Sequence, residues 1–535
     1  MSGYSLWSKP WIPVQPLEGL ATKVSLHQAL TQAHTFRGVL DPSPLITVAL
    51  HRLLLALIYR THPLRRFSDW QAVWEAGVLD TTAITSYGEQ MAHRFDLLHP
   101  THPFYQVGFM EEARVHPMAA LVETSKDNSP ALFDHGRVEG SFELDLDRAA
   151  CYLLAHQLFA VPGGRSKPFY RSDAPLTAGM VVEVVGGTLF ETLMLNAMTV
   201  DQWGDLVPTD GTDRPSWEEE CSPEPVKEGT PPLGILDYLT WQSRRIHLVV
   251  DEQRRVVTGC QIAQRYCLPK DGSRYDPGKA YYLSKGKGFK PRRLQRDRAA
   301  WRLTHVLLQT SEHKQSQPQV VAWLAALRRR ERRFDKPTLP KSVSLTVSGL
   351  TTDPTKAAKI ELWRREEIGL PLALLENKQL IDHVSRFMKT AGLVEHHLRR
   401  TGEALIWAMT QRAHQAEAIQ YIWTGKTGSS KMPPTVGSVA RSLGITLAYW
   451  AAMEAPFRRM LWRLPEEDPA AVTASWHEAL QDNAKAAVTA ALTRLKVGGS
   501  PWEPLSLVED AFGRRLTRVL EKGREEAGND DSDED

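Results

Sequence analysis

The feature that most constrains the fold is a change of pattern at Gly369-Leu370-Pro371. Beyond it, apolar residues recur at spacings of three and four with almost no β-branched runs, which is the period of amphipathic helices. Asp468 can cap one of these helices, with Pro469 in its first turn. Four such segments, separated by stretches rich in Gly, Pro and Ser, predict an up-and-down four-helix bundle: residues 372–413, 436–464, 469–497 and 505–522.

Residues 1–370 show a different pattern, in which short β-like runs and helical segments mix without βαβ regularity. The apolar run 45–59 is interrupted by His51 and Arg52 and is too short to span a bilayer, so it predicts a buried helix. Prolines in the aromatic run 5–14 favour an edge strand. Helices are expected at 26–37, 45–60, 298–309 and 319–333, and strands at 180–185, 246–250 and 343–347.

These patterns predict an α+β fold class. A large mixed α/β N-terminal domain is expected over residues 1–370, followed by the four-helix bundle over 371–524. The last residues, 525–535, lack apolar content and are expected to form a disordered acidic tail.

Charge is distributed unevenly along a chain whose net charge is only +2. The tail has seven acids and no base, and without it the chain has 65 basic and 56 acidic residues. Between residues 284 and 333, fourteen Lys or Arg stand against three acids, an imbalance typical of nucleic-acid binders. The alternative is a solvated helix face, which suits the arginines between 328 and 333, because cations also complement a helix dipole there.

The stretch Ala160-Val-Pro-Gly-Gly-Arg-Ser-Lys167 is a candidate contact loop for a polyanion. It follows a helical segment, 149–159, which Pro162 ends. Gly163 and Gly164 allow positive φ and close approach of the backbone to a partner, and Arg165 and Lys167 follow at once. The alternative is an ordinary surface turn with solvated charges.

Motifs for catalysis and cofactors are mostly missing from the sequence. A Walker A site fails at Gln420, and no G-x-S-x-G, G-x-G-x-x-G or H-E-x-x-H occurs. Cys260 and Cys267 lack a CxxC partner, so we expect no metal site and no cofactor. Acids at 218–220 and 366–367 could hold Mg²⁺ in a nuclease, but consecutive acids are more often solvated surface.

The cellular compartment is suggested by two further features. Four cysteines in 535 residues are too few for a disulfide scaffold. The first residues have neither the basic nor the apolar region of an export signal. We therefore expect a cytoplasmic protein that does not act at a membrane.

Several motifs together resemble the CasA family: residues 6–14, 94–106, 238–246, Ala300-Trp301 and 358–364, in this order along nearly the whole chain. Members of this family are the large subunit of Cascade, the type I-E CRISPR surveillance complex. The resemblance implies an α/β N-terminal domain and a C-terminal four-helix bundle. It also implies recognition of the protospacer-adjacent motif in double-stranded DNA. The implied partners are other Cascade subunits, CRISPR RNA, target DNA and a helicase-nuclease. The lack of a catalytic constellation in the sequence separately predicts that the chain is not an enzyme.

The resemblance also assigns residues to three loops and one lysine. The glycine loop falls on residues 162–167, with Gly163, Gly164, Arg165 and Lys167. A docking loop toward the CRISPR RNA falls on Leu132, Phe133, Asp134 and His135, and a lysine near the motif is matched by Lys270. The wedge hairpin that splits the duplex falls on 351–359. Many relatives have a glutamine at its tip, but this stretch contains no glutamine, and Lys356 and Ala357 stand nearest to that position.

Two other functions remain open at this point. The chain could be a metal-dependent nuclease subunit, which cleavage by the isolated protein would reveal. It could instead be a scaffold subunit of a ribonucleoprotein that reads no motif. Assembly without any motif preference would favour the scaffold.

Overall fold

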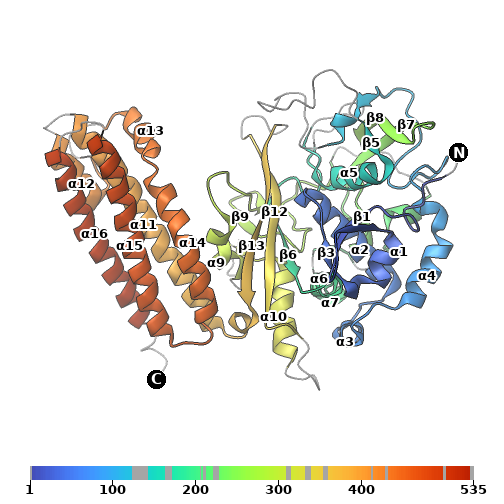
Figure 1. Ribbon diagram of the computed structural model, residues 1–535, viewed down its shortest axis with the longest axis horizontal. Helices are drawn as coiled ribbons and strands as arrows, with labels where there is room; N and C mark the ends of the chain where they lie inside the picture. Colours follow the sequence, from blue (N-terminus) through green and yellow to red (C-terminus); the bar gives the residue numbers. More distant parts are fainter. Residues whose placement is uncertain are drawn as a thin grey trace. The chain divides into compact units, whose positions relative to one another are not determined.

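The computed structural model describes residues 3–122, 143–162, 172–204, 206–208, 212–220, 228–308, 315–331, 339–353, 359–410, 414–427, 432–497 and 502–529. The chain forms two compact units, Met1–Leu372 and Ala373–Asp535 (Figure 1). Their boundary lies two residues from the one expected at residue 370. A first unit with mixed helices and strands and a helical second unit confirm the predicted α+β class.

Helix α2 (Pro44–Thr61) forms the centre of the first unit, and every residue from Pro44 to Ile58 is buried. It packs against α5 (Leu146–Phe159) and α8 (Ile235–Leu239). At 18 residues the helix is long and apolar enough to cross a membrane by length and composition, but 83% of it is buried within the protein. Its burial therefore confirms the predicted core helix, but the prediction that this segment is too short to span a bilayer is wrong, because the helix extends beyond the apolar run.

The strands of the first unit form four small sheets. The sheet that contains the segment expected to form the wedge hairpin has the order β13-β12-β6, and its two long strands run side by side in Figure 1. A second sheet, β4-β8-β5, also holds β7, and the other two have the orders β2-β1-β3 and β10-β9-β11. Their bounds are β1 Ile12–Pro16, β2 Thr22–Val24, β3 Phe36–Val39, β4 His116–Pro117, β5 Leu144–Asp145, β6 Val181–Val185, β7 Arg244–Asp251, β8 Val256–Gln264, β9 Tyr281–Ser284, β10 Gly288–Pro291, β11 Gln315–Ser316, β12 Ser342–Thr352 and β13 Ile360–Pro371.

The expected strands at 180–185, 246–250 and 343–347 are confirmed as β6, β7 and β12. The edge-strand prediction for the N-terminal run is wrong, because β1 lies between β2 and β3. Pro13 lacks a backbone N–H but still accepts a hydrogen bond from the Leu40 N–H through its carbonyl, and the register shifts between Gln15 and Pro16. The remaining helices of this unit are α1 Leu26–Thr31, α3 Phe67–Ala76, α4 Thr81–Gln90, α6 Leu189–Asn196, α7 Val200–Trp203, α9 Thr304–Leu308 and α10 Gln319–Glu331.

The single helix expected over 26–37 is also wrong. A capping box between Ser25 and Gln28 starts α1, but the helix ends at Thr31. From Phe36 the chain forms β3, whose residues pair with β1. Sheet pairing, which depends on distant residues, thus overrides the local helical pattern.

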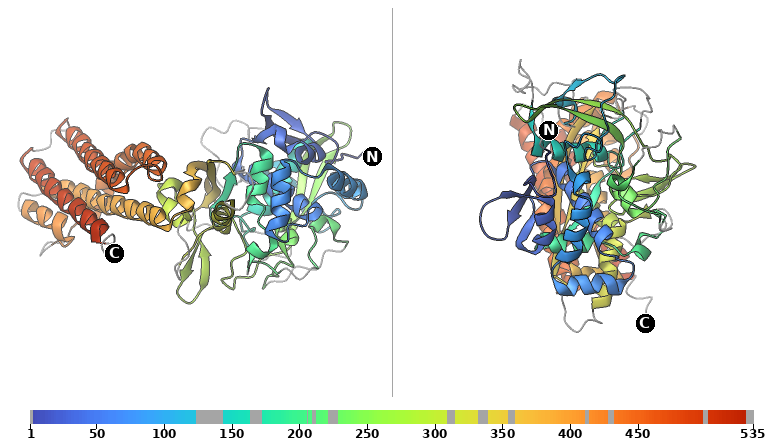
Figure 2. Two further views of the ribbon diagram at one scale, coloured as in Figure 1. Left: turned by 90° about the horizontal axis from the view of Figure 1, so that it is seen from below. Right: turned by 90° about the vertical axis from the view of Figure 1, so that its right-hand side faces the viewer.

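The second unit consists of α11 (Lys378–Thr410), α12 (His414–Thr424), α13 (Pro434–Ser442), α14 (Ile445–Arg463), α15 (Pro469–Val497) and α16 (Trp502–Asn529). Its long helices run alongside one another (Figure 2), and α11 contacts α14, α15 and α16. The helix expected over 436–464 is interrupted at Gly444, whose φ is 65°. This interruption separates α13 from α14, and α12 lies between the first two expected segments, so the described part of this unit has two shorter helices beyond the four expected ones.

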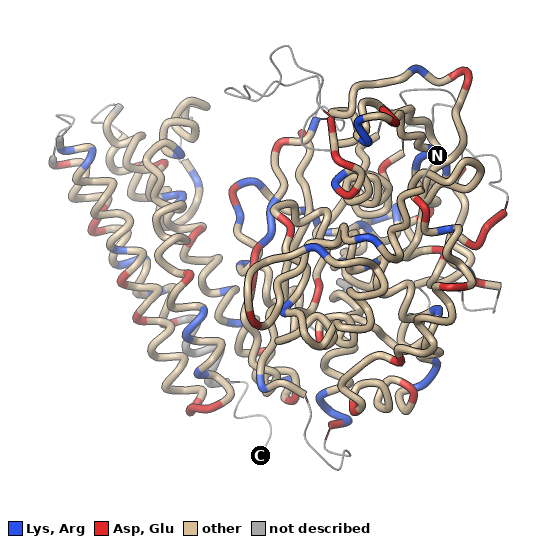
Figure 3. The backbone as a smooth tube through the Cα atoms, turned by 45° about the vertical axis from the view of Figure 1, so that its right-hand side comes forward, with Lys and Arg blue, Asp and Glu red and all other residues tan. Residues whose placement is uncertain are grey.

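Charges of both signs alternate along the helices of this unit (Figure 3). Helix α16 continues to Asn529, so the first five residues of the expected disordered tail are helical. Residues 530–535 lie outside the described residues.

Candidate nucleic-acid interface

Most of the site residues expected from the sequence lie outside the described residues: Gly163, Gly164, Arg165 and Lys167 of the glycine loop, Leu132, Phe133, Asp134 and His135 of the docking loop, and Lys356 and Ala357 of the wedge hairpin. Lys270 is described, and it is exposed in the connection between β8 and β9. The geometry of the interface therefore comes from Lys270 and from the residues at which the other segments begin and end.

The two ends of segment 163–171 lie side by side. Helix α5 ends at Phe159, and the Ala160 carbonyl accepts hydrogen bonds from the Ala174 N–H at 2.9 Å and from Thr177 Oγ1 at 2.8 Å. The Leu176 N–H donates to the Leu158 carbonyl at 2.8 Å. These bonds hold the chain after the segment against the chain before it.

Arg244, the first residue of β7, lies at the same place. Its side chain is buried, and its guanidinium donates to the carbonyls of Val161 at 3.2 Å and Ser172 at 2.9 Å. Gln157 of α5 fixes the backbone of Arg244, accepting from its N–H and donating to its carbonyl, each at 2.9 Å. The sequence reasoning missed this residue, since an Arg-Arg pair at the start of a strand carries no signal of a buried role.

Positive charge gathers around Asp173, next to the end of the segment. The residue is exposed, yet loss of hydration around its carboxylate raises its pKa, which four cations oppose. These cations are Arg293, Lys270, Lys279 and Arg244. Lys270 therefore lies near Asp173, at the C-terminal end of the segment that contains the expected glycine loop.

Lys279 is a buried member of this group, with 5% of its surface exposed. Its Nζ donates to the Pro175 carbonyl at 2.6 Å. Burial lowers the pKa of its ammonium group to about 8. Two buried cations, Arg244 and Lys279, thus hold backbone carbonyls of the short stretch 172–175.

The base of the wedge hairpin borders the same region. A small cavity of about 60 Å³ is lined by Asp173, Thr177, Ala178, Arg293, Leu294 and residues 350–352 at the end of β12. The Asp353 N–H donates to the Lys359 carbonyl at 2.9 Å, which joins the two described ends of the segment between β12 and β13. One end of the glycine-loop segment, Lys270 and the hairpin base therefore meet around Asp173.

A basic hairpin formed by β9 and β10 adjoins Lys270. Gly272, in the same connection as Lys270, packs so closely that a Cβ there would lie 2.7 Å from the Gly288 Cα. The Phe289 N–H also donates to the Gly272 carbonyl at 2.9 Å. Within the described part of the chain, no acid pairs with the hairpin lysines Lys285, Lys287 and Lys290. Their charge remains available to a polyanion.

The basic residues between 284 and 333 do not all have the same role. Arg328 in the last turn of α10 forms an ion pair with Glu331. Arg330 lies over the ring of Phe67 at 4.6 Å. Arg328 and Arg330 thus bind protein groups rather than forming the solvated helix face considered from the sequence, in contrast to the hairpin lysines. Arg332 and Arg333 lie outside the described residues.

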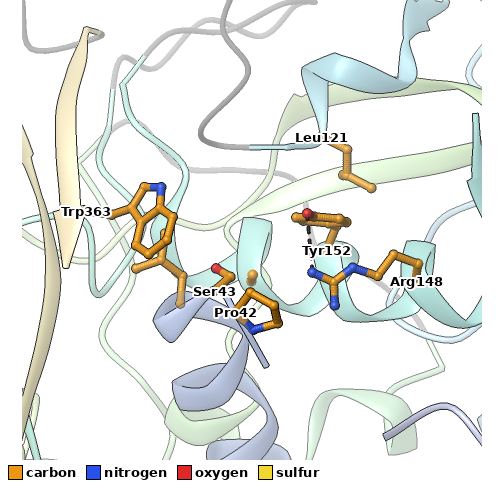
Figure 4. Close-up of a pocket in the computed structure, with 8 residues that line it drawn as sticks. Pro42, Ser43, Leu121, Arg148, Tyr152 and Trp363 are labelled. Atoms are coloured by element: carbon orange, nitrogen blue, oxygen red, sulfur yellow. Dashed lines mark hydrogen bonds between the residues drawn. The ribbon is translucent and has the colours of Figure 1, made fainter. Parts of the chain in front are cut away.

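A larger cavity of about 120 Å³ is also bordered by the hairpin stem (Figure 4). Trp363 of β13, which is 38% exposed, stands on one side, and Tyr152 with Arg148 stands on the other. Leu121, just before the segment that contains the docking loop, completes the apolar lining. The stem of the wedge hairpin and the start of the docking-loop segment thus border one apolar cavity.

The acids considered for a magnesium site bind protein groups instead. Glu218 accepts hydrogen bonds from Arg60 at 2.7 Å and from Tyr87 at 2.5 Å. Glu219 pairs with Arg265 at 3.3 Å, and Glu366 accepts the Ala300 N–H at 2.6 Å. In the described ranges, no three His, Cys, Asp or Glu side chains gather in an arrangement that could hold a metal ion.

Comparisons with known proteins place the whole chain in one family. A chain of a CRISPR RNA-guided surveillance complex has a TM-score of 0.72 at 19% identity, over 96% of this chain and 99% of its own. The crystal structure of Cse1 from Acidimicrobium ferrooxidans has a TM-score of 0.78 at 23% identity, over 98% and 99% of the two chains. CRISPR-associated protein CasA/Cse1 of Thermus thermophilus is 29% identical, over 97% of this chain and 99% of its own. The family model described as CRISPR-associated protein Cse1 matches residues 5–487, so the chain belongs to the CRISPR-associated Cse1 family.

Proposed function

We propose that this chain is the large subunit of a type I-E Cascade surveillance complex and reads the protospacer-adjacent motif in double-stranded DNA. Family membership and the likeness to a chain of a CRISPR RNA-guided surveillance complex support the proposal. In such a complex, base pairing with the guide RNA reads the target, while protein reads only the short motif.

The observation that carries the proposal is the convergence around Asp173. One end of the glycine-loop segment, Lys270 and the base of the wedge hairpin meet there, beside the lysines of the β9–β10 hairpin. The lysines attract any duplex through its phosphates. Backbone amides of Gly163 and Gly164 then contact the minor groove, whose degenerate pattern suits small and permissive contacts.

Strand opening is assigned to the wedge hairpin. A hairpin that inserts next to the recognised motif separates the first base pairs after it, at a cost of a few kcal/mol for each unstacked step. Lys356 and Ala357 stand at the tip of this hairpin in our proposal. The ladder of β12 and β13, paired from Ser342 with Pro371 to Thr352 with Ile360, gives the tip a rigid stem.

The other assigned partners follow from the same role. Phe133 in the docking loop anchors the chain on the CRISPR RNA and neighbouring subunits, and the assembled complex recruits the helicase-nuclease that degrades the target. The chain itself is not an enzyme in this proposal and acts in the cytoplasm. Pairing of Glu218, Glu219 and Glu366 with protein groups argues against the nuclease alternative.

A binding series tests the proposal. Complex is reconstituted with and without this chain, and its affinity is measured for duplex targets that differ only in the flanking motif. We expect motif discrimination only when the chain is present. Assembly of a complete complex with equal affinity for all flanking sequences would support the scaffold alternative and overturn the proposal.

A further inference from the structure

Arg244 joins the two ends of the glycine-loop segment through one guanidinium group. Its Nη2 lies 3.2 Å from the Val161 carbonyl and 2.9 Å from the Ser172 carbonyl, while Nη1 donates to the Ser243 carbonyl at 2.9 Å. The two bridged residues flank segment 163–171 on either side. We propose that Arg244 is a positioning residue for motif reading, which fixes both ends of the glycine loop so that its backbone amides reach the minor groove.

The chemistry of the side chain fits this role. A guanidinium is planar and presents donors in fixed directions, so it can hold several carbonyls at once in a defined geometry. A lysine ammonium has three donors on a flexible stem and cannot reproduce the fork. Arg244 is 2% exposed, and Asp173 supplies a nearby negative charge. The guanidinium is therefore buried against protein groups and is not accessible to DNA.

The surroundings of Arg244 are rigid. The Gln157 side chain ties its backbone to α5, and the rest of β7 pairs along β8. A single neutral hydrogen bond also holds the N-terminal end of the segment, where Thr177 Oγ1 donates to the Ala160 carbonyl at 2.8 Å. The acceptors at Val161 and Ser172 lie 83 and 72 residues away along the chain, so the side chain of Arg244 links β7 to both ends of the segment.

Positioning and charge attraction predict different consequences. If the ends of the segment separate, the amides lose their register with the groove, whereas Arg165, Lys167 and the hairpin lysines still attract phosphates. Recognition that depends on close backbone approach tolerates little displacement, since a shift of about 1 Å can cost roughly a hundredfold in precisely oriented sites. Loss of Arg244 should therefore reduce the preference for motif-bearing DNA and leave affinity for other duplexes unchanged.

The test uses Arg244→Lys in the reconstituted complex. We measure affinities for matched and motif-less duplexes and compare their ratio with that of the wild type. The ratio should fall by about tenfold or more, with motif-less affinity unchanged and complex assembly intact. Arg265→Lys is the matched control, because Arg265 is equally buried but binds Gln242 and Glu219; its ratio should stay at the wild-type value.

A second variant covers the case in which Arg244→Lys does not fold. Thr177→Val removes only the hydroxyl that holds the Ala160 carbonyl, so it should lower the ratio in the same direction by a smaller factor. The inference rests on the proposed function. Motif discrimination by the wild-type complex shows which of the two fails. Absence of motif discrimination in wild type overturns the proposed function. If the wild type discriminates and folded Arg244→Lys keeps the same ratio, the role of Arg244 is overturned while the proposed function stands. If Arg244→Lys does not fold, an unchanged ratio in Thr177→Val has the same consequence.

Discussion

Lys279 gives the first unit a stability that depends on pH. The side chain is buried, and burial lowers its pKa from 10.5 to about 8, against the attraction of Asp276 and Asp173. A shift of this size corresponds to about 3 kcal/mol, which is the cost of keeping the ammonium charged inside the protein. Lys279→Met removes that titration, and it also leaves the Pro175 carbonyl without its donor.

The sign follows from proton binding. Below pH 8 the lysine is charged in both the folded and the unfolded chain. The folded state therefore bears the full free-energy cost of a buried ammonium charge. Between pH 8 and 10.5 the unfolded chain binds more protons than the folded one, so stability rises with pH. From pH 7.5 to 9.5 this contribution should increase the free energy of unfolding of the wild type by about 2 kcal/mol relative to Lys279→Met.

Urea unfolding of the full chain at these two pH values measures the effect. The transition of the first unit is followed by limited proteolysis, and that of the second unit serves as an internal reference. Lys285→Met is the control, since Lys285 lies in the exposed turn of the β9–β10 hairpin and should leave the pH dependence of the wild type unchanged. Equal pH dependence of wild type and Lys279→Met would refute the reasoning.

Three further predictions concern the proposed function. Phe133→Ala should leave the fold intact but weaken docking onto the RNA-containing complex, as binding to immobilised complex would show; a large loss of thermal stability with normal docking would favour a core role. Lys356→Asp should slow strand opening, followed by a fluorescent base analogue next to the motif, more than it weakens initial motif binding. Equal effects on both steps would make Lys356 a general phosphate contact. The purified chain should cut neither DNA nor RNA with Mg²⁺ or Mn²⁺, and EDTA-sensitive cleavage lost on substitution of one acid would refute this.

The sequence predicted the helices of the second unit well because long amphipathic helices carry their pattern locally. The interruption at Gly444 was missed, although a glycine that can adopt a φ of 65° is a common way to end a helix. In the first unit, residues 26–37 have a helical pattern, yet Phe36 pairs with Pro16 in a sheet. Such pairing cannot be read from neighbouring residues.

The residues of the candidate site also differ in whether the sequence alone could identify them. The glycine loop and Lys270 could be proposed from the sequence because glycines, cations and family motifs mark them. Arg244 and Lys279 could not, since their roles depend on carbonyls that lie 72 to 104 residues away along the chain. A buried cation that holds backbone looks like any surface lysine or arginine until the fold is known.

The most direct test of motif reading by the glycine loop is the affinity of complexes carrying Gly164→Asp for matched and motif-less duplexes at several salt concentrations. A β-carbon and a negative charge at this position should abolish the difference between the two duplexes. Arg165→Ala and Lys167→Ala should instead weaken binding to both and flatten the salt dependence by about one unit of slope for each lost contact. Full motif discrimination by a folded Gly164→Asp complex would contradict the assignment of motif reading to this loop.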